Sequence, residues 1–234
     1  ERDAQKLLVF RHKSCKRSDA EFVKALTANY RAEHVFALKQ ALALYDAYTG
    51  QIAECDAQIE QQFSVIKPIH SDDLPPLDKS RKFNSHAKNA PNFDARGQMY
   101  RITGVDLTDI DGLHASTAQT ILSEIGTDMS RWPTVKHFAA WLGLAPRNDI
   151  TGGKVKRSRV LKSHSPANQA FRMAAQSVAR TKTALGAFYR RRRARLGEAQ
   201  AIVATAHKIA RTVYFMLKHR TAFLPMSADD YDQR

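Results

Sequence analysis

Hydrophobic side chains recur between residues 32 and 66 at alternating steps of three and four. Positions 35, 38, 42, 45, 49, 52, 56, 59, 63 and 66 hold Val, Leu, Leu, Tyr, Thr, Ile, Asp, Ile, Phe and Ile. Eight of these ten are apolar, a heptad pattern that predicts one long helix with an apolar seam. A helix of ~36 residues is about 54 Å long, more than a small domain covers. We therefore predict a coiled-coil or helical-hairpin arm that forms a homo-oligomer, the alternative being a helix packed on its own domain.

The pattern divides the rest of the chain around this arm. We predict a helical lead-in over 1–31, the arm over 32–66, a linker over 67–98, a compact helical domain over 99–223 and a tail over 224–234. Ser18 and Glu21 have the spacing of a capping box, and prolines among polar residues are typical of the linker. The predicted fold class is mainly α, with few and short strands.

Positive charge is concentrated in one part of the chain. No Asp or Glu occurs between Ile150 and Gly197, a stretch that holds 13 of the Lys and Arg residues, whereas the whole chain has a formal net charge of +14. Charge segregated in this way is typical of a surface that binds nucleic acid. Apolar residues such as Phe171, Leu185 and Phe188 interrupt the charges at helical spacing, which favours a folded surface over a disordered basic tail.

Several classes of protein are disfavoured by composition. The longest apolar run, residues 138–145, is too short to cross a bilayer, so no membrane partner is expected. Cys15 and Cys55 lie far apart and the nine His are scattered, so we predict an intracellular protein without disulfides or zinc. The chain begins with Glu1 rather than Met, and we expect it to be a piece of a longer protein.

A tight turn at Gly112 leads into a segment with helical spacing of apolar residues. This arrangement resembles a helix-hairpin-helix element, whose backbone N–H groups contact a phosphate. We predict contacts from Gly112 and from His114, which stands where a second hairpin glycine is usual. An ordinary helical hairpin inside the core is the alternative. The nearby Asp106, Asp109 and Asp111 suit turns and helix starts better than a metal site, so no metal is predicted here.

A second motif, Thr151-Gly152-Gly153-Lys154, is predicted at the tip of a loop that follows a helix ending at Gly143. Paired glycines let the backbone approach a ligand closely. A hydroxyl before them and a lysine after them suit a phosphodiester held against a nucleophile. The motif lacks the spacing of a Walker A loop. Thr151 is therefore the candidate catalytic residue.

Further basic residues extend the predicted interface along the acid-free stretch. A helix is expected from Ser165, and a run of four arginines follows Tyr189. Four adjacent arginines cannot share one helix face. The candidate nucleic-acid-binding residues are Gly112, His114, Gly152, Gly153, Lys154, Lys156, Arg157, Arg159, Lys162, Arg172, Arg190, Arg191, Arg192 and Arg193.

Nine short blocks in a fixed order resemble insertion-sequence transposases of the IS-one-ten/IS-eleven-eleven (IS116/IS110/IS902) family. They begin at residues 102, 110, 123, 141, 152, 172, 184, 194 and 206. The blocks correspond to the C-terminal part of that family, and the segment from Glu33 also resembles its coiled-coil region. The resemblance covers most of the chain.

The resemblance implies an RNA-guided DNA recombinase with two domains. Its N-terminal RNase-H-like domain carries four metal-binding acids, so Mg is expected there and no cofactor in this chain. Its catalytic serine corresponds to Thr151, which keeps the hydroxyl and adds a methyl group. DNA and a structured guide RNA are the implied partners, in the bacterial cytoplasm at the nucleoid. The isolated chain is expected to be inactive, and the alternative is a non-catalytic DNA/RNA-binding and oligomerisation module.

Overall fold

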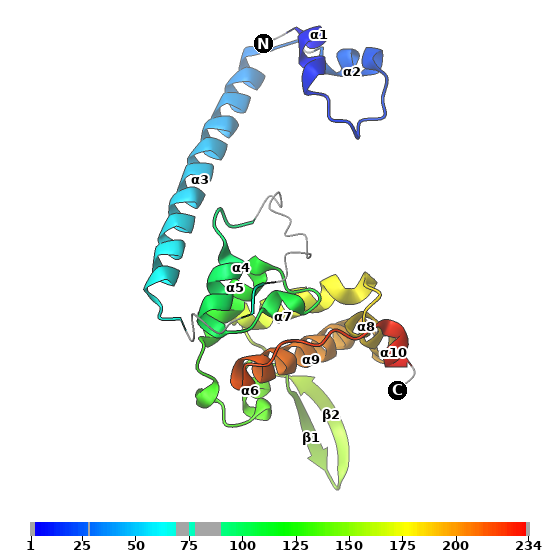
Figure 1. Cartoon of the computed structure of the whole chain (residues 1–234). Coiled ribbons are helices and arrows are strands. Elements are labelled where there is room, and N and C mark those ends of the chain that lie inside the picture. Colours follow the sequence, from blue (N-terminus) through cyan, green and yellow to red (C-terminus); the bar gives the residue numbers. More distant parts are fainter. Residues whose placement is uncertain (1–2, 28, 69–74, 78–89, 233–234) are drawn as a thin grey trace. The chain divides into compact units, whose positions relative to one another are not determined.

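The computed structural model describes residues 3–27, 29–68, 75–77 and 90–232 of the chain. It divides into two compact units, residues 1–54 and 55–234 (Figure 1). The described chain is mainly helical, as predicted, with one two-stranded antiparallel sheet. Much of the predicted linker lies outside the described residues. Among the described helices, none has the length and apolar character that crossing a bilayer requires.

The first unit begins with the short elements α1 (Ala4–Leu7), η1 (Leu8–Phe10) and α2 (Asp19–Leu26). The predicted capping box starts α2. The Ser18 hydroxyl accepts a hydrogen bond from the Glu21 N–H at 3.3 Å, and the Glu21 carboxylate accepts one from the Ser18 N–H at 3.1 Å. The predicted helical lead-in thus consists of α1 with η1, followed after a loop by α2.

The heptad segment forms one continuous helix, α3 (Ala32–Val65). Its seam has two different environments. Leu38 and Leu42 are 69% and 57% exposed, and Tyr45 and Ile52 are exposed as well. Towards the end of the helix Phe63 is buried and its ring centroid lies 6.0 Å from that of Phe93. The end of the seam thus packs on its own domain, whereas its earlier part is uncovered.

Hydrogen bonds explain why a carboxylate interrupts the seam. The Asp56 carboxylate accepts a bond from the Asn92 N–H at 3.0 Å. Arg101 donates to the carbonyl oxygen of Ile66 at 2.9 Å and to that of Phe63, at the end of α3. Asp56 therefore ties α3 to the segment that enters the second unit's helical body.

The second unit is a helical body built around α9. Its elements are α4 (Ala95–Thr103), η2 (Leu107–Asp109), α5 (Ala115–Ile125), η3 (Met129–Arg131), α6 (Val135–Trp141), β1 (Pro146–Thr151), β2 (Lys154–Val160), α7 (Pro166–Ser177), η4 (Val178–Arg180), α8 (Ala184–Leu196), α9 (Glu198–His219) and α10 (Ala228–Asp232). Helices α6, α7 and α8 pack on α9, and α5 packs on α7. Phe138, Phe171 and Tyr214 are fully buried in this core. Helix α4 begins at Ala95, earlier than the predicted domain boundary at 99.

The C-terminal segment, predicted as a tail, packs on α8. Residues Thr183 and Ser227 form an antiparallel bridge, and the Ala184 N–H donates to the Met226 carbonyl at 3.2 Å. Helix α10 then lies beside α8 (Figure 1). The end of the chain therefore belongs to the helical body.

Strands β1 and β2 form a hairpin where the sequence suggested a loop, and the hairpin projects from the helices (Figure 1). Gly152 and Gly153 have φ values of 58° and 72°, the left-handed conformation that a two-residue hairpin turn requires. Polar residues occupy both faces of the strands, so the alternation that usually reveals a strand is missing.

Candidate nucleic-acid interface

Thr151 lies at the tip of the hairpin, where its side chain is accessible. Thr151 is exposed and lies opposite Lys154 in the β register. Its hydroxyl forms no hydrogen bond within the described part of the chain. A Cβ atom placed on Gly152 or Gly153 would meet nothing within 4 Å, so the backbone around the hydroxyl is accessible. A phosphodiester can therefore reach this hydroxyl without displacing another side chain.

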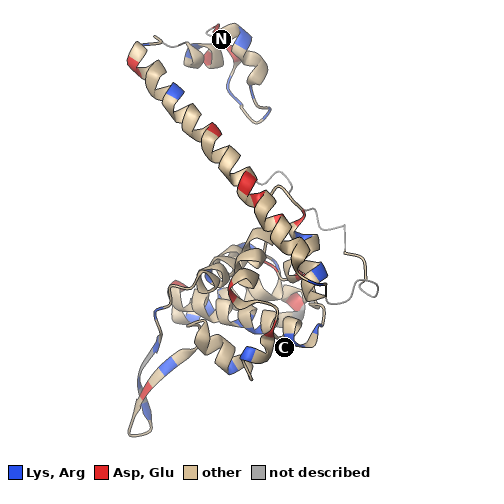
Figure 2. Ribbon diagram, turned by 90° about the vertical axis from the view of Figure 1, so that its left-hand side faces the viewer, with Lys and Arg blue, Asp and Glu red and all other residues tan. Residues whose placement is uncertain are grey.

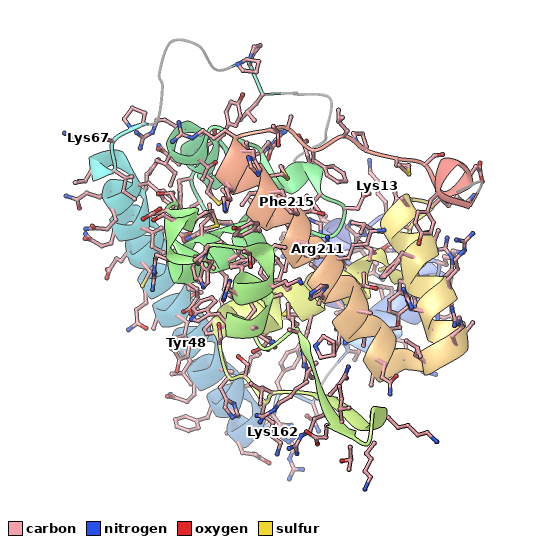
Figure 3. The ribbon with its side chains drawn as sticks, turned by 90° about the horizontal axis from the view of Figure 1, so that it is seen from below. Lys13, Tyr48, Lys67, Lys162, Arg211 and Phe215 are labelled. Atoms are coloured by element: carbon pink, nitrogen blue, oxygen red, sulfur yellow. The ribbon has the colours of Figure 1, made fainter. Side chains whose placement is uncertain are left out.

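Basic side chains follow the hairpin from its tip to its base. Lys154, Lys156 and Arg159 are exposed on β2, and Lys162 lies at the base where the chain leaves the strand (Figure 3). Figure 2 shows Lys and Arg along the projecting hairpin. Arg159 lies opposite Arg147 on β1, and like charges placed directly across a ladder are unfavourable. A bound polyanion would relieve this repulsion. The side chain of Arg157, another predicted contact, lies outside what the structure describes.

The turn before α5 packs closely on α7 through Gly112. Gly112 has a φ of 87°, and a Cβ there would lie 2.6 Å from the Ala174 carbonyl oxygen. The Ser177 hydroxyl donates to the Gly112 carbonyl at 3.3 Å. The glycine is therefore needed for helix packing, as the alternative of a core hairpin predicts. His114 is exposed at the start of α5 and its side chain does not cap the helix. The phosphate contact from this turn stays a prediction.

Asp106 has a structural role. It is 8% exposed and accepts hydrogen bonds from the Arg96 Nε at 2.8 Å and from the Thr108 N–H at 2.9 Å. Within the described residues no three His, Cys, Asp or Glu side chains gather into a possible metal site. The divalent metal that the resemblance implies stays an expectation for another domain.

The side chains of the four adjacent arginines of α8 make different contacts, as predicted for residues that cannot share one helix face. Arg190 donates to the carbonyls of Ala179 at 3.3 Å and Thr181 at 2.8 Å. Arg191 lies 5.0 Å from the Tyr231 ring centroid, and Arg192 lies 5.2 Å from that of Phe188. Arg193 is exposed. Arg190 thus helps to close the turn before α8, and Arg191, Arg192 and Arg193 remain candidates for a phosphate contact.

Arg172 holds a buried donor on α7. Its Nε atom has no hydrogen-bond partner within the described chain, and neither has the buried hydroxyl of Ser165 at the start of the same helix. These positions are seven residues apart and so lie on one helix face. A buried donor without an acceptor costs about 1–3 kcal/mol, which an anionic ligand would recover. The contact of Arg172 with nucleic acid stays a prediction.

A cluster around α9 was missing from the predicted site. The Lys208 Nζ lies 4.4 Å from the Phe188 ring centroid and 4.6 Å from that of Tyr231. Burial, Arg192 and Arg211 lower the pKa of Lys208, and burial and Arg211 lower the pKa of His207. The spacing of Lys208 and Arg211 places both side chains on one face of a single helix. Nothing in the sequence indicated that Tyr231 lies against it.

Comparison with known proteins found one match, to part of the chain. No curated protein and no solved structure matches the chain. One family model matches residues 106–190, a segment that starts at the Asp106 cap and ends within α8. It includes the Gly112 turn, the whole hairpin and α7. The model is that of the transposase IS116/IS110/IS902 family, so this segment carries the domain of that transposase family.

Proposed function

We propose that this chain is the DNA-binding and strand-transferring part of a transposase. One observation carries the proposal. The Thr151 hydroxyl is exposed and unbonded at the glycine tip of a projecting basic hairpin, inside the segment that matches the transposase family. A tip of this kind can enter a groove of duplex DNA, because a two-stranded β-ribbon fits the major groove.

The proposed reaction is an attack of the Thr151 oxygen on a scissile phosphorus. A bond forms between that oxygen and phosphorus, and the leaving oxygen of the strand departs with its electron pair and takes up a proton. Lys154, directly across the turn, is placed to stabilise the charge that develops on the phosphoryl oxygens. Attack by the hydroxyl of another strand on the Thr151 ester restores a phosphodiester and releases the threonine. The base that removes the threonine proton is assigned to another domain, because no described side chain bonds to the hydroxyl.

The basic surface around the hairpin supports DNA as the partner. Lys156, Arg159 and Lys162 continue the charge away from the tip, and Arg172 on α7 has a buried Nε donor without a partner among the described residues. Phosphate contacts of this kind position the duplex without reading its sequence. Target choice is therefore assigned to another component, consistent with the guide RNA that the resemblance implies.

The rival function is a non-catalytic module that binds DNA or RNA and forms oligomers. The packing role of Gly112 and the exposed seam of α3 suit this function equally well. The Thr151 hydroxyl separates the two functions, because only the transposase requires it.

Binding to duplex DNA should weaken steeply with salt. If the surface neutralises ~6 phosphates, the slope of log affinity against log salt should be about −5. Lys156→Ala together with Arg159→Ala should bring that slope closer to zero by about 2. Fluorescence anisotropy between low and moderate salt measures the slope. As a control, Lys13→Ala with Lys24→Ala removes the same charge from the first unit and should leave the slope unchanged. Affinity that does not respond to salt would contradict the proposal.

We also propose that the uncovered part of the α3 seam pairs with a second copy as a coiled coil. Leu38→Asp together with Leu42→Asp puts charges into this seam and should dissociate the oligomer. Sedimentation velocity measures the change in mass. Gln40→Asp adds a charge on the helix face opposite the seam and should leave the oligomer intact. A monomeric wild-type chain at tens of micromolar would rule out the pairing.

A further inference from the structure

A cavity of about 460 Å³ lies in the second unit, where the turn before α5, helices α8 and α9 and the C-terminal segment meet. It is lined by Asp111, Ala184, Leu185, Arg191, Lys208, Thr212, Phe223, Leu224, Met226 and Tyr231. Its volume is within the range of about 300–1,000 Å³ that is usual for small-ligand sites. No residue of this lining belongs to the hairpin or to the predicted catalytic tip.

Positive charge gathers on one side of the cavity. Lys208 and Arg191 line it, and both lie close to the Tyr231 ring. Arg211 follows Lys208 along α9 (Figure 3). Burial lowers the pKa of Lys208, and the nearby positive charges of Arg192 and Arg211 lower it further. Its charged form is therefore disfavoured. An anion placed beside Lys208 and Arg191 would remove this penalty.

The other walls of the cavity are apolar with two polar groups. Leu185, Phe223 and Met226 contribute apolar surface. The Thr212 hydroxyl donates to the Lys208 carbonyl at 3.2 Å, so its lone pairs remain available as acceptors. The Asp111 carboxylate offers further acceptors. A ligand that matches these walls has an apolar planar face, N–H donors on its edge and a negatively charged group beside it.

We propose that this cavity binds one unpaired nucleotide of a nucleic-acid strand, with its phosphate at Lys208 and Arg191 and its base edge at Thr212 and Asp111. The inference rests on the proposed function, since the strand is the one held on the basic surface. The same chemistry would also suit a free mononucleotide. The strand is the better source because Asp111 adjoins the Gly112 turn and Arg191 belongs to the arginine run of α8.

A duplex with one unpaired 2-aminopurine tests the site on the unmodified protein. The comparison uses the same duplex fully paired, and AMP as the free nucleotide. We expect the bulged duplex to bind about tenfold more tightly than the paired duplex, since placing one base on a protein surface is worth about 1–3 kcal/mol. The 2-aminopurine fluorescence should change on binding, and AMP should compete only weakly. Full competition by AMP at micromolar concentration would instead assign the cavity to a free nucleotide.

Substitutions in the cavity lining test whether the preference for the bulged duplex comes from this cavity. Thr212→Val and Asp111→Asn should each remove most of the preference for the bulge while leaving affinity for the paired duplex unchanged, and Thr212→Ser should retain the preference. Arg195→Ala, an exposed position outside the lining, should weaken binding of both duplexes equally. Equal binding of the two duplexes by the unmodified protein, or a preference that survives both variants, would overturn the cavity assignment alone. Failure to bind either duplex would overturn the proposed function as well.

Discussion

Thr151→Ala is expected to abolish DNA strand cleavage in a protein that carries the metal-binding domain implied by the resemblance, and Thr151→Ser to increase it. Alanine removes the only hydroxyl at the glycine tip, and loss of a nucleophile costs about a thousandfold or more in rate. Serine keeps the hydroxyl and removes the methyl group that crowds an in-line attack on phosphorus. Cleavage is followed with a labelled duplex, and the covalent product appears as a protein–DNA band that survives denaturation.

Ile150→Ala is the matched control for this experiment. Ile150 is the exposed neighbour of Thr151 on β1, so its replacement trims the same part of the hairpin without removing a hydroxyl. Cleavage and the covalent band should persist in this variant. Unchanged cleavage by Thr151→Ala would falsify the assignment of the nucleophile and would turn attention to Ser158, Ser163 and Ser165. A covalent band in the wild type would exclude the non-catalytic rival.

Asp106→Ala is expected to lower the free energy of unfolding by about 3–5 kcal/mol. Its partner Arg96 is 9% exposed, so removal of the carboxylate breaks a buried ion pair. The same carboxylate caps η2 through Thr108, and loss of that cap adds about 1 kcal/mol. Urea unfolding followed by circular dichroism measures the change.

Asp128→Ala separates the ion pair from the cap. Asp128 caps η3 as Asp106 caps η2, accepting from the Ser130 N–H at 2.8 Å, but it is exposed. Its replacement should cost only about 1 kcal/mol. Similar losses for the two variants would mean that the buried pair contributes nothing beyond the cap.

Local features of this chain could be predicted from its sequence. The heptad pattern predicted the long helix α3, and Ser18 with Glu21 predicted the capping box of α2. The ordered motifs resemble the transposase family whose model matches residues 106–190. These features depend on residues a few positions apart, or on composition, so neighbouring residues suffice to indicate them.

The candidate site was predicted in part. Thr151, the paired glycines and Lys154 were identified together, but their hairpin was not, because polar residues on both strand faces hide the period of two. The sequence did not show that the missing side chain of Gly112 allows α7 to pack against the turn, and its phosphate contact stays a prediction.

The sequence by itself therefore determined the long helix α3, the cap of α2, the concentration of positive charge and the resemblance to the transposase family. Only the tertiary structure decided which side chains meet. Asp56 bonds to Asn92, Phe63 packs against Phe93, and Lys208 lies against Tyr231 and lines a cavity with Asp111. Residues so far apart in the chain come together only when the apolar faces of α5, α7, α8 and α9 pack into one core. Periodicity within one element shows that such a face exists but not what covers it.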